Sequence, residues 1–184
     1  MTEDIVASSV YYTPYNGNKM SLWDGAHFVE QSFSEISLSL AGIVGGTLYD
    51  VFATEAGGLA LEAWTNVNAR AVAVNRIEGI VCDAARRTLL GSVYATANSQ
   101  SKYQLRPEPA GYGSAPVVGL ANIYNRRRIR SQCQDSISEW SYGSNGIRFV
   151  NNSEAGWTVS IVDPLGESEI CAHYSVSMAG APQA

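Results

Sequence analysis

Charged residues are scarce in this sequence of 184 residues. Only 16% of them are Asp, Glu, Lys or Arg, whereas roughly 25% is usual for a soluble domain. The 12 basic residues are outnumbered by 17 acidic ones, which gives a net charge of -5. The overall field therefore opposes binding to nucleic acid and to anionic membranes, and we expect no nucleic acid among the partners.

Long apolar runs are absent as well. No stretch approaches the ~20 apolar residues that a membrane-spanning helix needs. The opening MTEDIVASS lacks the basic and apolar segments of a signal peptide. We therefore expect no membrane insertion and a protein that stays in the cytosol until it assembles.

Cysteine and histidine are few and scattered. Cys82, Cys133 and Cys171 are odd in number and show no Cys-x-x-Cys spacing, which argues against a disulfide framework or a zinc site. Reduced, half-buried thiols are the expectation, although the sequence does not fix their state. The two histidines, His27 and His173, are expected at turns or interfaces. No metal and no other cofactor is predicted.

Sequence signatures of catalysis are missing too. There is no phosphate-binding glycine loop, no Gly-x-Ser-x-Gly elbow and no His-Glu-x-x-His helix. A pair of carboxylates could serve a glycosidase, but nothing in the sequence singles out two of them. The acidic candidates are Asp24, Glu30, Glu35, Asp50, Glu55, Glu62 and Glu78. The protein is predicted not to be an enzyme, with a polysaccharide depolymerase as the remaining catalytic alternative.

What the sequence does contain is short β-prone runs separated by turn residues. Asn16-Gly17 and Asp24-Gly25 tolerate the positive φ of tight turns and predict a hairpin at each position. Residues 36–40 alternate apolar and polar side chains, as a half-buried strand does. Further strands are expected at 47–53, 59–64, 71–74, 79–81 and 86–95.

The sequence divides into parts near residue 95. Residues 96–116 lose periodicity and are rich in Pro, Gly, Ser and Gln, which predicts a loop or an intersubunit arm. Residues 118–130 fit either a strand or a short helix, and four β-prone runs near the C-terminus predict an antiparallel meander. We predict an all-β fold: an antiparallel β-sandwich or jelly-roll-like N-terminal module at 1–95 and a smaller C-terminal β module at 117–184.

Aromatic residues gather near the N-terminus. Tyr11, Tyr12, Tyr15 and Trp23 are candidate surface-binding aromatics, for which a host surface glycan is a conceivable ligand. Because strand alternation buries about half of such rings, core packing and a subunit interface are the favoured interpretation.

A basic cluster lies in the second half of the chain. Tyr124 precedes Arg126, Arg127, Arg128 and Arg130. In an acidic protein such arginines more often pair with carboxylates of an adjoining subunit than with nucleic acid, so this cluster is predicted to make intersubunit contacts.

Several motifs, in order, resemble a domain common in phage structural proteins. They are Tyr-Thr-Pro-Tyr-Asn-Gly-Asn from Tyr12, Trp-Asp-Gly from Trp23, Tyr-Asp-Val-Phe from Tyr49, Trp-Thr-Asn from Trp64, Arg-Arg-Thr-Leu-Leu-Gly from Arg86 and Tyr-Asn-Arg from Tyr124. Such domains occur in tail-fibre, head-fibre and other virion proteins, often as the last part of a longer polypeptide. Here few residues precede the first motif, which favours a free-standing protein.

The resemblance implies a structural role on the exterior of a virion. The expected function is capsid decoration, as a cement or head-fibre protein that assembles in the host cytoplasm, and a tail-fibre or receptor-binding tip is the alternative. Phage shells offer three-fold sites and phage fibres are commonly trimeric, so the expected partners are further copies in a homotrimer and the major capsid protein or another virion protein.

Overall fold

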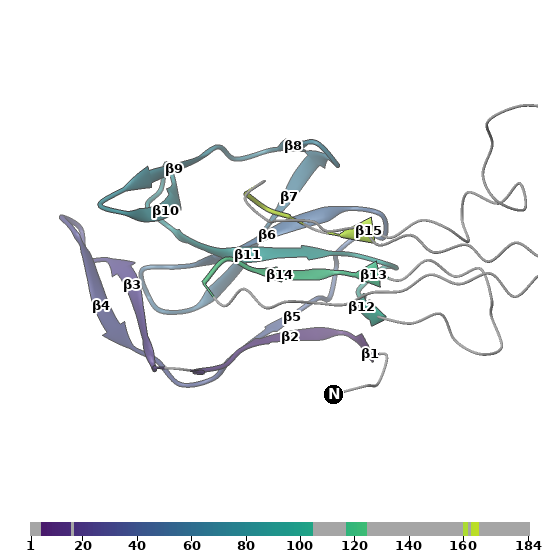
Figure 1. Cartoon of the computed structure of the whole chain (residues 1–184), viewed down its shortest axis with the longest axis horizontal. Coiled ribbons are helices and arrows are strands. Elements are labelled where there is room, and N and C mark those ends of the chain that lie inside the picture. The colour runs from purple at the N-terminus through teal and green to yellow at the C-terminus, as the bar shows by residue number, and fades with distance from the viewer. Residues whose placement is uncertain (1–4, 16, 105–116, 125–159, 162, 166–184) are drawn as a thin grey trace, which may run out of the picture.

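The computed structural model describes residues 5–15, 17–104, 117–124, 160–161 and 163–165. Every regular element among them is a strand, and none is a helix (Figure 1). The predicted all-β fold is therefore confirmed for this part of the chain. Accordingly, no helix that could cross a membrane occurs in these ranges.

The strands are short and follow one another closely. In chain order they are β1 (Ile5–Ala7), β2 (Ser9–Tyr12), β3 (Lys19–Trp23), β4 (Phe28–Ser32), β5 (Ile36–Ser39), β6 (Leu48–Ala53), β7 (Leu59–Asn66), β8 (Ala69–Arg70), β9 (Val74–Ile77), β10 (Ile80–Asp83), β11 (Thr88–Tyr94), β12 (Ser101–Gln104), β13 (Val117–Val118), β14 (Leu120–Asn122) and β15 (Ser160–Ile161).

The largest sheet has the order β8-β7-β6-β11-β10-β9, and β14 pairs with β11 on the side away from β6. Its pairings are antiparallel, and the sheet curls like half of a barrel (Figure 1). A second sheet has the order β1-β12-β13-β15, in which β13 and β15 are parallel. Two separate ribbons, β2–β5 and β3–β4, complete the described fold.

The two faces of β6 bury different side chains, as the period of two along a strand requires. Tyr49, Val51 and Ala53 lie on one face, and Asp50 and Phe52 alternate with them on the other. All five residues are buried. The strand thus sits between two packed layers.

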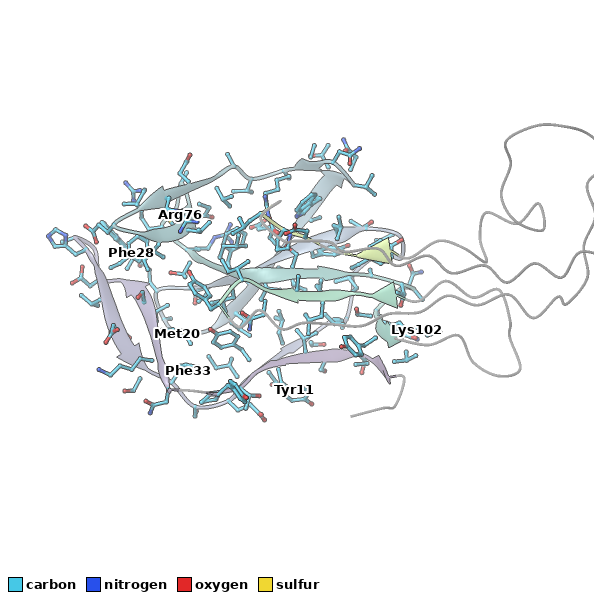
Figure 2. All side chains as sticks on the ribbon, in the orientation of Figure 1. Tyr11, Met20, Phe28, Phe33, Arg76 and Lys102 are labelled. Atoms are coloured by element: carbon cyan, nitrogen blue, oxygen red, sulfur yellow. The ribbon has the colours of Figure 1, made fainter. Side chains whose placement is uncertain are left out.

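The two ribbons cover the face that carries Val51. Val10 and Leu38 of the β2–β5 ribbon pack against a cluster that includes Val51. Met20 of the β3–β4 ribbon packs with Ala53 and points from β3 toward the interior (Figure 2). Burial of these apolar side chains, at about 25 cal/mol per Å² of area, holds the ribbons on the sheet.

A β-bulge in β11 distributes its side chains between the two faces. The register with β6 shifts between Leu89 and Gly91. Leu89 packs with Phe52, whereas Leu90, the extra residue, packs with Met20 on the opposite face. Beyond the bulge Ser92 stands opposite Asp50. The extra residue shifts the register by one, and this shift places the Ser92 side chain next to the Asp50 carboxylate.

The predicted hairpins have different outcomes. Asp24-Gly25 does connect a hairpin, β3–β4, through the loop 24–27, and Gly25 has a φ of +103°. The hairpin predicted at Asn16-Gly17 is wrong. Gly17 has a positive φ of +144°, but β2 pairs with β5 and β3 pairs with β4.

Strands expected at 36–40, 47–53, 59–64 and 86–95 appear as β5, β6, β7 and β11. The strands expected at 71–74 and 79–81 are displaced, since β9 and β10 form a hairpin around Glu78-Gly79. Both turn residues have positive φ, +49° and +83°, as a type I′ turn requires. Glu-Gly is a weaker signal for this turn than Asn-Gly.

The irregular segment expected at 96–116 is partly a strand. Ser101–Gln104 form β12 and pair with β1 on one side and β13 on the other. Long-range pairing stabilises a strand where local periodicity is weak. The segment 117–124, open between strand and helix in the sequence, contains β13 and β14.

Most of the predicted C-terminal meander lies outside the described residues. Of the module expected at 117–184, the structure describes 117–124, 160–161 and 163–165. Within these ranges β14 pairs with β11 of the N-terminal part, and β15 pairs with β13. The three-part division of the chain therefore stays a prediction.

The close approach of β14 to β11 predicts a sensitivity at Gly91. A Cβ on Gly91 lies 1.9 Å from the carbonyl oxygen of Ala121. Gly91→Ala is expected to displace β14 and to lower the free energy of unfolding by roughly 1–3 kcal/mol, as overpacking does. Urea unfolding measures the loss, and hydrogen exchange of the Tyr94 amide, which donates to Gly119, reports on β14.

Gly58→Ala is the matched control, because its Cβ meets nothing closer than 3.4 Å. Equal stability of the two variants, with unchanged exchange at Tyr94, contradicts the proposed packing of β14.

Candidate functional site

A buried carboxylate lies inside the curl of the large sheet. Asp50 is 2% exposed. One of its oxygens accepts a hydrogen bond from Arg70 Nε at 2.6 Å, and the other accepts from the Ser92 hydroxyl. Arg70 also donates to the carbonyl oxygen of Pro164. The charge of Asp50 is therefore compensated on both oxygens, as a buried charge requires.

A second ion-pair cluster lies on the same sheet. Asp83, also 2% exposed, accepts from Arg87 Nε at 2.7 Å and from the Arg87 backbone N–H at 2.8 Å. Arg87 Nη1 lies 2.8 Å from a carboxylate oxygen of Glu62. One guanidinium thus joins β10, β7 and the start of β11.

Both arginines also lie over aromatic rings. The guanidinium of Arg70 is 4.6 Å from the ring centroid of Trp64, and that of Arg87 is 4.9 Å from that of Phe52. Such cation–π contacts add to the ion pairs. The Trp64 indole N–H is buried without a hydrogen-bond partner among the described residues. These contacts stabilise the curled sheet.

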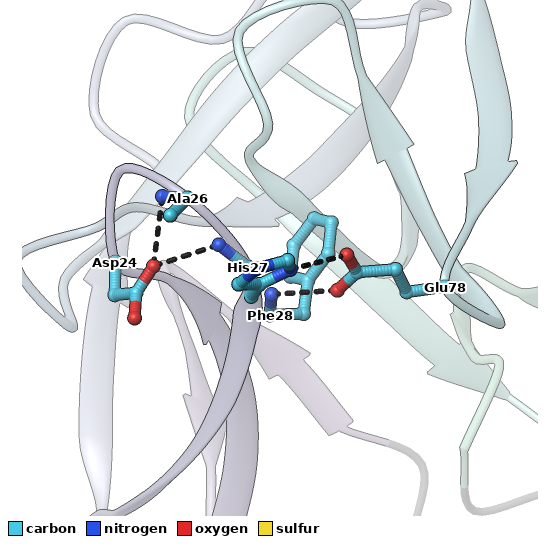
Figure 3. Close-up of polar contacts among 5 residues, drawn as sticks. All are labelled: Asp24, Ala26, His27, Phe28 and Glu78. Atoms are coloured by element: carbon cyan, nitrogen blue, oxygen red, sulfur yellow. Dashed lines mark hydrogen bonds and ion pairs between the residues drawn. The ribbon is translucent and has the colours of Figure 1, made fainter.

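A third polar group joins the tips of two hairpins. Glu78, in the β9–β10 turn, accepts from Phe28 N–H at 2.9 Å and lies 2.9 Å from His27 Nδ1 (Figure 3). Asp24 accepts from the N–H groups of Ala26 and His27, both at 2.8 Å. We call the contact between His27, Phe28 and Glu78 the hairpin clamp.

The clamp shifts the pKa values of its members. The hydrogen bond to Glu78, and then its charge, raises the pKa of His27 above 6.5. The hydrogen bonds from His27 and from Phe28 N–H lower the pKa of Glu78 below 4.5. Each shift favours the charged form, so both members of the pair are mainly charged between pH 4.5 and 6.5.

The four aromatic residues singled out in the sequence are divided by the fold. Tyr11 and Tyr15 are 61% and 58% exposed. Tyr12 is half-buried against Phe33, with ring centroids 5.1 Å apart. Trp23 packs against Phe28 and lies beneath the Arg86 guanidinium, so it belongs to the hairpin packing.

Two neighbouring grooves meet at Tyr12 and Leu90. The first, of about 50 Å³, lies between β2 and β14 and includes Tyr11 and Leu120 among its lining. The second, of about 150 Å³, is lined by β3, β4 and β10 and by Tyr124. We call Tyr11, Tyr12, Leu120 and Tyr124 the tyrosine face. Figure 2 shows Tyr11 on the outer side of the β2–β5 ribbon.

Sequence reasoning placed Tyr124 among possible intersubunit residues. The structure places it next to the second groove, together with Tyr12. Arg126, Arg127, Arg128 and Arg130 lie outside the described residues, and their predicted role stays a prediction. Sequence reasoning missed Leu120, because no local signal shows that β14 lies near β2.

Cys82 is buried on β10, and this burial raises the pKa of its thiol. It forms no disulfide with a described residue, while Cys133 and Cys171 lie outside the described part. Within the ranges that the structure covers, no group of three His, Cys, Asp or Glu side chains is placed to hold a metal ion.

Comparisons of the chain with protein-family models, with curated proteins and with solved structures found no match.

The Asp50 cluster predicts a large effect of removing its cation. Arg70→Ala leaves a buried carboxylate without its charged partner and is expected to cost roughly 3–5 kcal/mol of unfolding free energy. Lys19→Ala, which removes an exposed ion pair with Glu30, is expected to cost less than about 1 kcal/mol. Urea unfolding compares the two, and similar losses contradict the special position of Asp50.

The hairpin clamp predicts a pH window. The contribution of His27 is complete below its ordinary pKa of 6.5 and is lost as pH rises through its raised pKa. That of Glu78 is complete above 4.5 and is lost as pH falls through its lowered pKa. Hydrogen exchange in β3 and β4 is therefore expected to be slowest, relative to the intrinsic rate, between pH 4.5 and 6.5.

The NMR titration of His27 tests the clamp directly. Its midpoint is expected above 6.5 in the unaltered protein and closer to 6.5 in Glu78→Gln. Glu30→Gln, which alters an exposed carboxylate of β4 paired with Lys19, is the control. The same midpoint in Glu78→Gln and the unaltered protein rules the clamp out.

Proposed function

We propose that this protein is a structural component of a phage virion, a capsid decoration or head-fibre protein that binds the exterior of the particle and associates with itself. The ordered motifs that resemble phage structural domains support the class of protein. The exposed tyrosine face supports a protein that works by binding partner proteins.

The observation that carries the proposal is the exposure of large apolar side chains on this face. Tyr11 is 61% exposed, Leu120 44% and Tyr124 50%, and the two grooves connect them through Tyr12. Clustered aromatic and apolar exposure of this kind is typical of surfaces that bind partners. In a chain with 16% charged residues, burial between subunits is the simplest way to cover such a surface.

The positions of the motif residues agree with a structural role. Asp50 of the Tyr-Asp-Val-Phe motif accepts from Arg70, which follows the Trp-Thr-Asn motif in β8. Arg87 of the Arg-Arg motif joins Asp83 to Glu62. The glycine of that motif, Gly91, has no side chain and so allows β14 to pack closely against β11. These residues are used in folding, which leaves the exposed face for binding.

The proposed partners are other copies of the chain, as a homotrimer, and the major capsid protein or another virion protein. Three-fold symmetry follows from the resemblance, because phage shells and fibres offer three-fold sites. A tail-fibre or receptor-binding tip is the second candidate, favoured by the exposed tyrosines, which suit a surface glycan.

Light scattering tests self-association. The unaltered protein is expected to be a trimer at micromolar concentration, and the double variant Tyr11→Ser, Leu120→Ser is expected to give smaller species because it removes apolar contact area. Val67→Ser, at an exposed residue of the β7–β8 turn, is the control and should leave the trimer intact. A monomeric unaltered protein refutes self-association.

Electron microscopy of the particle tests the location. Density for this chain on the head supports capsid decoration, density on the tail supports the receptor-binding alternative, and absence of the chain from the particle refutes the proposal. Release of reducing ends from host capsule by the purified protein points to the depolymerase instead.

A further inference from the structure

The second groove combines an aromatic wall with polar groups at its rim. Tyr12, Met20, Ile80, Leu90 and Tyr124 supply the apolar and aromatic lining. The polar lining comes from Lys19, Ser21, Glu30 and Thr88. Apolar surface with a few convergent polar groups is the usual composition of a small-molecule site.

Two phenol hydroxyls of the groove are available to a ligand. Neither the Tyr12 nor the Tyr124 hydroxyl has a hydrogen-bond partner among the described residues. By contrast, the Thr88 hydroxyl already donates to the Ser21 carbonyl at 2.6 Å. The tyrosine hydroxyls can therefore donate to, or accept from, a bound molecule.

Both phenols stay neutral across the physiological pH range. Burial raises the pKa of Tyr12. Burial, with a smaller effect from Tyr12, raises the pKa of Tyr124 to about 12. Tyr124 is nevertheless 50% exposed as a whole residue, which fits a ring that lies partly in the groove and partly open to solvent.

The charges at the rim cancel each other. Lys19 Nζ and Glu30 Oε2 are 3.3 Å apart, and both side chains are exposed. The residues that line the groove therefore carry no net charge, and Arg76 is a cation close enough to act on Tyr124 from outside the lining. The groove's volume of about 150 Å³ is below the roughly 300–1,000 Å³ of sites for drug-sized ligands, which suits a single ring.

From this combination we propose that the groove between Tyr12 and Tyr124 binds a neutral sugar ring. The C–H face of the sugar packs on the tyrosine rings, and its hydroxyls exchange hydrogen bonds with the two phenols and with the Lys19–Glu30 pair. The inference goes beyond assembly, since a virion protein can assemble through Tyr11 and Leu120 without binding any sugar here, and it gives the receptor-binding alternative a defined site.

Saturation-transfer NMR on the full chain tests the site with methyl glycosides of glucose, galactose, mannose and N-acetylglucosamine. At least one is expected to bind with a dissociation constant on the order of millimolar, as suits a ligand with about 12 non-hydrogen atoms. Glucuronate and glucosamine, the charged probes, are expected to bind more weakly. Absence of binding by every neutral glycoside overturns the proposal, as does preferred binding of a charged probe.

Conservative variants locate the binding. Tyr124→Phe and Tyr12→Phe keep the rings and remove one hydroxyl each, so each is expected to weaken binding about 3- to 10-fold without unfolding the protein, which a thermal melt verifies. Tyr15→Phe, at an exposed tyrosine that lines neither groove, should bind as the unaltered protein does. Undiminished binding in both groove variants places the sugar elsewhere and refutes the site.

The outcome is separable from that of the proposed function. Light scattering and particle location report on assembly, whereas saturation-transfer NMR reports on sugar binding in the groove. Loss of sugar binding with intact assembly therefore supports this site, whereas assembly without any sugar binding removes this inference alone.

Discussion

The fold depends on how the buried Asp50 carboxylate is compensated. Glu62 stands directly opposite it on β7, so two acidic side chains share one face of the sheet. Arg70 comes from the edge strand β8 and reaches Asp50, while Arg87 comes from the start of β11 and reaches Glu62. An isolated carboxylate in this position costs several kcal/mol. The curl of the sheet brings both guanidinium groups over the face that carries these two carboxylates.

The sequence contained enough to find most central strands but not their partners. Alternation along 36–40 predicted β5, because burial follows the period of a strand, and a strand was also expected at 47–53, where β6 lies. Which strands pair with each other depends on tertiary packing and not on the local sequence. Gly17 has a positive φ, yet β2 pairs with β5, and Val10 of β2 packs against the cluster that includes Val51. Likewise β12 forms where only long-range partners favour it.

The candidate site could be predicted only in part, for the same reason. Density of tyrosines marked Tyr11 and Tyr12, and both border the grooves. Trp23 was marked by the same reasoning, yet it is held by Phe28 and Arg86. Burial of a given ring depends on which element packs over it, which composition does not encode. Leu120 and Tyr124 border the grooves from β14 and from the residues just after it. Their position depends on the packing of β14 against Gly91, which no local pattern in the sequence indicates.

The pairing of β1 with β12 also bears on synthesis. Ile5 stands opposite Tyr103 in this ladder, so β1 leaves the ribosome well before the strand with which it pairs. During that interval the edge of β1 is open, and open edges invite pairing with other chains. The rate of translation between β1 and β12 thus sets how long the edge of β1 is exposed to neighbouring chains before the ladder closes.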